Sequence, residues 1–114
     1  MHEASLARGI LAAVLERVGS QPIRVVRVHG WLAETEALDA TSIQLHFDAA
    51  AEGTAADGAE LALRLTHVEA RCLACDTRYP PEHHLTLCPA CGSVDGELLG
   101  ETGLGVDRID VADP

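Results

Sequence analysis

The chemistry most plainly encoded in this chain lies in its four cysteines. They form two Cys-x-x-Cys pairs, which are Cys72 with Cys75 and Cys88 with Cys91, and 12 residues separate the pairs. Two thiolates at this spacing can reach one ion from a tight turn. Two such turns supply the four sulfurs that close a tetrahedral zinc site. Pro89 and Gly92 suit the second turn, because proline presets its φ angle and glycine accepts a positive one.

The segment between the pairs is polar and contains Pro80 and Pro81, so it cannot build a hydrophobic core. Metal binding must then provide its folding free energy, on the order of 10 kcal/mol for such sites. Three alternative functions of the cysteines stay open. Rubredoxin-like iron uses similar turns, although those small proteins are richer in aromatic residues. A dithiol redox centre needs only one pair. A nucleic-acid zinc ribbon needs basic loops, and only Arg71 and Arg78 lie nearby.

A second group of candidate ligands stands at the N-terminus, in Met1-His2-Glu3. It comprises the α-amine, the backbone amide and imidazole of His2, and the Glu3 carboxylate. Nitrogen donors in a near-plane favour Ni(II) or Cu(II) over zinc. Such a site is open, so its ligands can exchange, as a carrier requires. The plainer alternative is an exposed His2 and a Glu3 that complements the helix dipole.

Composition narrows the function. The chain has 114 residues, which suits one small domain with a metal-stapled appendage, and 18 acidic against 8 basic residues give a net charge of -10. This charge disfavours nucleic acids and anionic membranes, because phosphate binding needs Lys and Arg. No apolar run approaches the roughly 20 residues that span a bilayer. The N-terminus also lacks the pattern of a signal peptide. We therefore expect a cytoplasmic protein, where cysteines bind metals more often than they form disulfides.

Two helices must help position these sites. Residues 1–20 predict the first, because aliphatic residues recur every four positions at Leu6, Ile10, Val14 and Val18, and Gly19 is a plausible stop. Residues 36–50 predict the second, in which Ile43 and Phe47 lie four apart.

Three strands are expected. β-Branched residues predict a strand over 23–29, ended by Gly30. Alternating leucines predict a second strand over 60–70. A third is indicated by Val106 and Ile109, with a break of phase near Asp107.

The expected fold is α+β, with two helices packed on a three-stranded mixed sheet and an inserted four-Cys, zinc-ribbon-like module. Residues 1–70 plus 100–114 are expected to form a nickel-binding α/β domain, and residues 71–99 the zinc-binding insert.

Several segments together resemble the HypA family. Met1 to Leu6 is similar to the opening of HypA-family nickel metallochaperones, and Phe47 to Leu61 resembles the segment before the family's second strand. The two cysteine pairs, with Cys91-Gly92-Ser93, match its zinc module, and Gly105 to Val111 resembles its final strand. The likeness covers nearly the whole chain in the same order.

The resemblance implies a non-catalytic nickel metallochaperone that serves maturation of [NiFe]-hydrogenase. By position, the Met1 amine and His2 would bind Ni(II), with Glu3 as a supporting ligand, and Asp39 falls roughly where some members use a further carboxylate. The four cysteines would hold structural Zn(II). The implied partners are a HypB-like GTPase and the hydrogenase large subunit, and in related systems urease accessory proteins. The alternative is a zinc-ribbon interaction adaptor without nickel transfer.

The remaining histidines carry weaker signals. His83 and His84 form either a solvated loop pair or a metal-responsive contact near the zinc. His67 is expected to be a partly buried strand residue, and His46 to be a surface residue of the second helix. We assign no ligand role to His29.

Overall fold

The computed structural model describes residues 2–81 and 85–114, and it leaves the His2 side chain undescribed. The chain packs as two compact units. The helix–sheet unit comprises Met1–Leu32, Asp39–Leu65 and Leu104–Pro114, and the cysteine unit comprises Ala33–Leu38 and Thr66–Gly103. No helix in the described part of the chain is long and apolar enough to cross a membrane.

The two helices are α1 (His2–Val18) and α2 (Ala40–Ala51). Gly19 ends α1 as predicted: its φ is 58°, and its N–H donates to the Leu15 carbonyl at 3.0 Å. The predicted start of α2 at residue 36 was wrong by four residues. Asp39 is the N-cap, and its carboxylate accepts from Thr41 N at 3.0 Å, which fixes the first turn.

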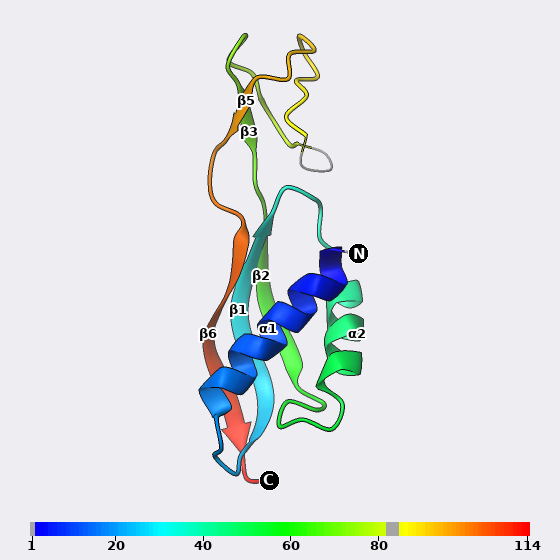
Figure 1. Cartoon of the computed structure of the whole chain (residues 1–114), viewed down its shortest axis with the longest axis vertical. Helices are drawn as coiled ribbons and strands as arrows, with labels where there is room; N and C mark the ends of the chain where they lie inside the picture. The colour runs from blue at the N-terminus through cyan, green and yellow to red at the C-terminus, as the bar shows by residue number, and fades with distance from the viewer. Residues whose placement is uncertain (1, 82–84) are drawn as a thin grey trace. The chain divides into compact units, whose positions relative to one another are not determined.

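Three strands form the main sheet, in the order β2 (Glu60–His67), β1 (Arg24–Glu34) and β6 (Gly103–Ala112). β1 and β6 run in opposite directions (Figure 1). β2 follows the direction of β1, since Arg27 pairs with Glu60 near both starts and Val68 N donates to the Glu34 carbonyl near both ends. The sheet is therefore mixed, as predicted.

The sequence had suggested that β1 ends at Gly30, and this prediction was wrong. The strand continues to Glu34. A Cβ on Gly30 would lie 2.3 Å from the Gly105 carbonyl oxygen of β6. The glycine permits a close backbone approach between strands. β2 also ends at His67, three residues earlier than predicted.

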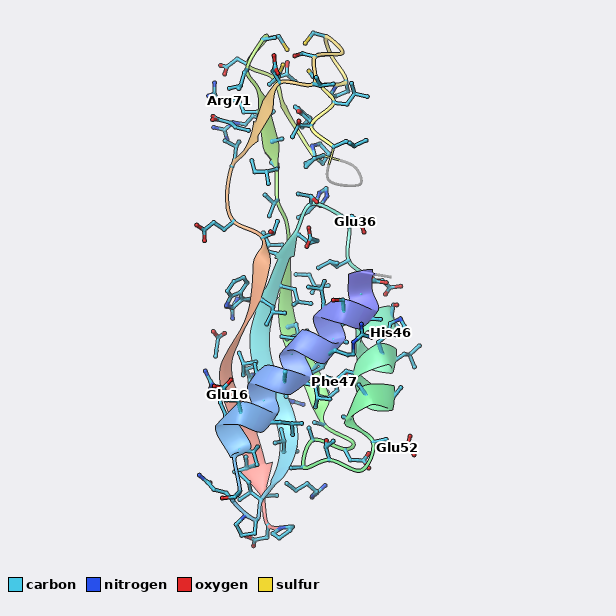
Figure 2. All side chains as sticks on the ribbon, in the orientation of Figure 1. Glu16, Glu36, His46, Phe47, Glu52 and Arg71 are labelled. Carbon is cyan, nitrogen blue, oxygen red and sulfur yellow. The ribbon has the colours of Figure 1, made fainter. Side chains whose placement is uncertain are left out.

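Both helices lie on the same side of the sheet and bury the apolar stripe that the sequence indicated (Figure 1). Ile10, Val14 and Phe47 are fully buried, as are Val28 and Leu32 of β1. Phe47 of α2 lies in this interior beside α1 (Figure 2).

Side chains from the helices reach both edge strands. At the start of β2, Gln44 Nε2 donates to the carbonyl of Ala59, the residue before the strand, at 3.1 Å, while Gln44 Oε1 accepts from Leu61 N at 2.8 Å. On β6, the guanidinium of Arg17 donates to two successive carbonyls, those of Val106 and Asp107. The structure gives β6 as one continuous strand, Gly103–Ala112, and the break of phase expected near Asp107 stays a prediction.

A second antiparallel sheet in the cysteine unit was not predicted. Its strands are β3 (Ala70–Cys72), β4 (Arg78–Tyr79) and β5 (Gly96–Leu98), in the order β4-β3-β5. Ala70 pairs with Tyr79 on one side and with Leu98 on the other. The buried cluster of this unit consists of Ala70, Cys72, Tyr79 and Cys88. Two of these four residues are cysteines, so the core of the unit is also its candidate metal site.

Candidate metal centres

The four cysteine sulfurs meet at one point. Their Sγ atoms all lie within 4.8 Å of one another, with Cys72 to Cys91 and Cys75 to Cys88 each at 3.6 Å. A tetrahedral zinc with bonds of about 2.3 Å places its sulfurs roughly 3.8 Å apart. The cluster is therefore close to the size that a tetrathiolate zinc site requires.

The two turns that carry the sulfurs share one backbone pattern. Cys72 N donates to the Thr77 carbonyl and Cys88 N to the Ser93 carbonyl, both at 2.9 Å. In each turn the residue after the second cysteine donates back to the carbonyl of the first, again at 2.9 Å. Two equivalent turns thus present two sulfurs each to a common centre.

The residue after the second cysteine has a positive φ in both turns. Gly92 has φ 75°, as its sequence position predicted, whereas the first turn has Asp76 at φ 66°. Sequence reasoning missed Asp76, although aligning Cys-Asp-Thr with Cys-Gly-Ser would have revealed it. Asp tolerates this region better than most side chains. Arg71 Nη1 also donates to Asp76 Oδ1 at 2.6 Å, while Nε of the same guanidinium donates to Glu97 Oε1 at 3.0 Å.

Tyr79 connects the first half of the cysteine unit with the second turn. Its hydroxyl donates to the Thr86 carbonyl at 2.7 Å, two residues before Cys88. A Cβ at Gly96 would lie 2.5 Å from this hydroxyl, so β5 approaches the ring closely. Burial raises the pKa of Tyr79, which keeps the phenol protonated as a donor.

The thiols differ in acidity. A hydrogen bond with the Thr77 hydroxyl lowers the pKa of Cys75 to about 6. The backbone of Ser93 favours the thiolate of Cys91, but the neighbouring sulfurs Cys72 and Cys75 outweigh it and raise the pKa of Cys91 to about 12. Like charges this close cannot all ionise without a compensating cation. A divalent, thiophilic ion fits this donor set.

The N-terminal group is described only in part. Met1 and the His2 imidazole lie outside the described residues, so the predicted nickel ligands stay predictions. The backbone of His2 is described, and His2 is the first residue of α1. Glu3 Oε2 accepts from Asp39 N at 2.7 Å, so the start of α1 is held against the cap of α2. The structure therefore brings Glu3 next to Asp39, the further carboxylate that the resemblance had suggested.

Among the described residues, His29 and His67 each lie within hydrogen-bonding distance of an oxygen. His29 Nε2 lies 2.9 Å from Asp110 Oδ2, and His67 Nε2 lies 2.6 Å from the Thr35 carbonyl oxygen. His67 is exposed by its total area, contrary to the expectation of partial burial. His46 lies on α2, as expected (Figure 2). His83 and His84 fall outside the described residues.

Comparison with known proteins places the chain among nickel metallochaperones. Residues 1–111 match the family model described as HypA, hydrogenase/urease nickel incorporation, metallochaperone. The hydrogenase maturation factor HypA of Polaromonas naphthalenivorans is 34% identical over 116 aligned positions, which cover 99% of each chain. That of Acidithiobacillus ferrooxidans is 30% identical, with 97% of this chain and 99% of the relative covered.

Solved structures show the same fold. The solution structure of the Ni metallochaperone HypA from Helicobacter pylori superimposes with a TM-score of 0.57 at 18% identity, covering 98% of both chains. A second solution structure, of a HypA protein, gives the same TM-score at 20% identity.

Proposed function

This chain belongs to the HypA family of hydrogenase/urease nickel incorporation metallochaperones, and from that membership we propose that it carries Ni(II) at its N-terminus for insertion into the large subunit of [NiFe]-hydrogenase. The family description is that of a carrier and not of a catalyst. The observation on which the proposal rests most is that one chain holds two unlike donor sets. One is the cluster of four sulfurs in the structure, and the other is the set of nitrogen and carboxylate donors that the sequence offers in Met1-His2-Glu3.

Zinc is the ion proposed for the sulfur cluster, with Cys72, Cys75, Cys88 and Cys91 as its ligands. Bound zinc would neutralise part of the thiolate charge and supply the folding free energy of the cysteine unit. The residues around it prepare the site. Ala74 N and Cys75 N both donate to Cys72 Sγ at 3.4 Å, so two backbone N–H groups of the turn are directed at this sulfur.

Nickel is the proposed cargo of the N-terminal group. The first four N–H groups of a helix have no intrahelical partner, so the amide of His2 is not needed for α1. The Met1 amine and His2 imidazole would then chelate the ion, with Glu3 in support. Glu3 already accepts a hydrogen bond from Asp39 N, so its second oxygen is the one proposed for nickel. Both nitrogen groups lose protons when they bind, and acid should release the cargo.

The proposed partners are a HypB-like GTPase, the hydrogenase large subunit and, where urease is the client, urease accessory proteins. We place this transfer in the cytoplasm. The net charge of -10 argues against nucleic acid or anionic membrane as a partner.

Calorimetric titration of Ni(II) into untagged, zinc-loaded protein tests the proposal. We expect His2→Ala to abolish tight nickel binding, because it removes one arm of the chelate, while zinc content and the far-UV spectrum stay unchanged. His46→Ala is the matched control, since it removes an imidazole from the same unit and should leave the titration as in wild type.

Equal nickel binding by wild type and His2→Ala would refute the carrier role of the N-terminus. It would favour the alternative, a zinc-ribbon adaptor that binds other proteins and ignores nickel. A red colour in the purified protein, from ferric iron in the sulfur cluster, would instead favour a rubredoxin-like electron carrier.

A further inference from the structure

The cysteine unit exposes an unusual share of its large aliphatic side chains. Of the ten large hydrophobic residues that are exposed in the described chain, six belong to this unit: Leu73, Leu85, Leu87, Val94, Leu98 and Leu99. Single exposed aliphatic residues are common on any protein. A gathering of them marks a site of interaction.

Three of these residues lie on neighbouring backbone segments beside the sulfur cluster. Leu73 N donates to the Asp95 carbonyl at 2.8 Å, which sets the first turn against the residue that follows Val94. The Thr86 hydroxyl donates to the Val94 carbonyl at 2.9 Å, which brings Leu87 to the same segment. The exposed fractions of Leu73, Leu87 and Val94 are 56%, 55% and 72%. We call these three residues the knuckle patch.

The backbone that carries the knuckle patch is held by hydrogen bonds and by the metal turns. Leu73 directly follows Cys72, and Leu87 directly precedes Cys88, and both cysteines are buried in the core of the unit. The backbone of the two leucines is therefore held by the same turns that present the sulfurs. A preorganised backbone loses little conformational entropy when it binds, which favours docking.

Charge decides what can occupy the knuckle patch. The cysteine unit contains eight acidic residues against two arginines, Arg71 and Arg78. Arg71 is already paired with Asp76 and Glu97. Asp95, which lies next to the patch, is exposed. Glu34 is buried, but the excess of acidic residues remains, so two copies of this unit repel each other, and nucleic acid or an anionic membrane is repelled as well. A basic partner is attracted.

We propose that the knuckle patch docks an amphipathic segment of a partner protein, apolar along one stripe and bearing Lys or Arg on either side. The apolar stripe covers Leu73, Leu87 and Val94, and a basic side chain beside the stripe meets the exposed Asp95. This goes beyond nickel carriage, because it assigns partner recognition to the unit that does not hold the N-terminus. It rests on the proposed function only in requiring zinc to hold both turns.

Two synthetic helical peptides that share a leucine stripe and differ only in flanking Lys or Glu test this surface. Each is titrated into zinc-loaded, untagged protein while backbone amide shifts are followed by NMR. We expect the Lys peptide to shift amides at residues 73, 87 and 94 first, and the Glu peptide to cause no shifts. The double variant Leu73→Gln/Val94→Gln should weaken binding by about tenfold or more, because two apolar contacts are lost.

The control variant is Leu45→Gln, on α2, where a leucine 64% exposed is replaced in the helix–sheet unit. It should bind the Lys peptide as wild type does. Equal affinity for both peptides, or shifts confined to the helix–sheet unit, would overturn the proposal. So would self-association of the protein alone that the double variant abolishes, since the occupant would then be a second copy.

Failure of this proposal can be told from failure of nickel carriage. The double variant keeps Met1, His2 and all four cysteines. Its nickel titration and zinc content should therefore match wild type, whatever the peptides do.

Discussion

The two units of this protein reach a stable structure by different routes. The helix–sheet unit buries its large side chains, with Phe47, Ile10 and Leu32 fully enclosed. The buried cluster of the cysteine unit contains two cysteines, one alanine and one tyrosine. A hydrophobic core can specify the first unit, whereas we propose that a metal stabilises the second. On this proposal, the exposure of leucines in the cysteine unit costs little stability, because burial of apolar side chains contributes little to holding the unit together.

Removing the metal should produce the largest effect. We expect Cys72→Ser, or an excess of a strong zinc chelator, to unfold the cysteine unit and to leave the helix–sheet unit folded, because metal binding provides on the order of 10 kcal/mol. The chain has one tyrosine, Tyr79 in the cysteine unit, and one tryptophan, Trp31 in the helix–sheet unit. Their separate fluorescence signals distinguish the two outcomes, and simultaneous loss of both would contradict the comparison.

Phe47→Ala is the reciprocal change. It should destabilise the helix–sheet unit by about 3–5 kcal/mol, because it leaves a cavity between the two helices and the sheet. Zinc content should not change. Urea unfolding followed at Trp31 measures the effect, with Leu45→Ala as an exposed control on the same helix.

Substitutions at the positive-φ residues of the two cysteine turns should have smaller effects on stability, and the effects should differ between the turns. Gly92→Ala places a Cβ in a positive-φ conformation and should lower the stability of the zinc-loaded unit by about 1–2 kcal/mol, although no atom lies within 4 Å of that Cβ. Asp76→Gly should cost less, because glycine adopts that conformation freely and the exposed pair with Arg71 contributes little. Thermal unfolding followed at Tyr79 compares them. A larger loss for Asp76→Gly would show that its carboxylate, and not its backbone, matters.

The smallest effect concerns acid. The hydrogen bond with His29 lowers the pKa of Asp110 below its ordinary value of 3.8 in the folded protein. This carboxylate therefore adds stability above that ordinary value, and the contribution is lost as pH falls through the lowered one. Asp110→Asn should flatten the pH dependence of unfolding below about pH 4, measured at Trp31. An unchanged acid limb would show that the exposed pair contributes nothing.

Much of the helix–sheet unit could be predicted from sequence because its signals are local and periodic. The four-residue recurrence in α1 and the stop at Gly19 needed no tertiary information. The end of β1 was predicted wrongly at Gly30, because glycine is required there by the Gly105 carbonyl of another strand and not by a turn. The start of α2 was placed too early, because residues 36–39 lack a breaker and the capping role of Asp39 appears only in the structure.

The candidate metal site also has features that the sequence predicted and features that it did not. Cysteine spacing was enough to predict that four sulfurs would converge. It could not predict β3, β4 and β5, since strands of two or three residues carry no period. The hydrogen bond between Glu3 and Asp39 joins residues far apart in sequence and was not predicted; the resemblance had suggested only that Asp39 occupies roughly the place of a further carboxylate.

The side-chain amide of Gln44, on α2, forms the hydrogen bonds that a backbone peptide group would form at the edge of the sheet. Its amide both donates to Ala59 and accepts from Leu61, as a neighbouring strand would at that position. A foreign strand extending the sheet at Ala59 and Leu61 would first have to displace these two hydrogen bonds. The first part of the β2 edge is therefore already hydrogen-bonded within the chain, which disfavours edge-to-edge pairing there.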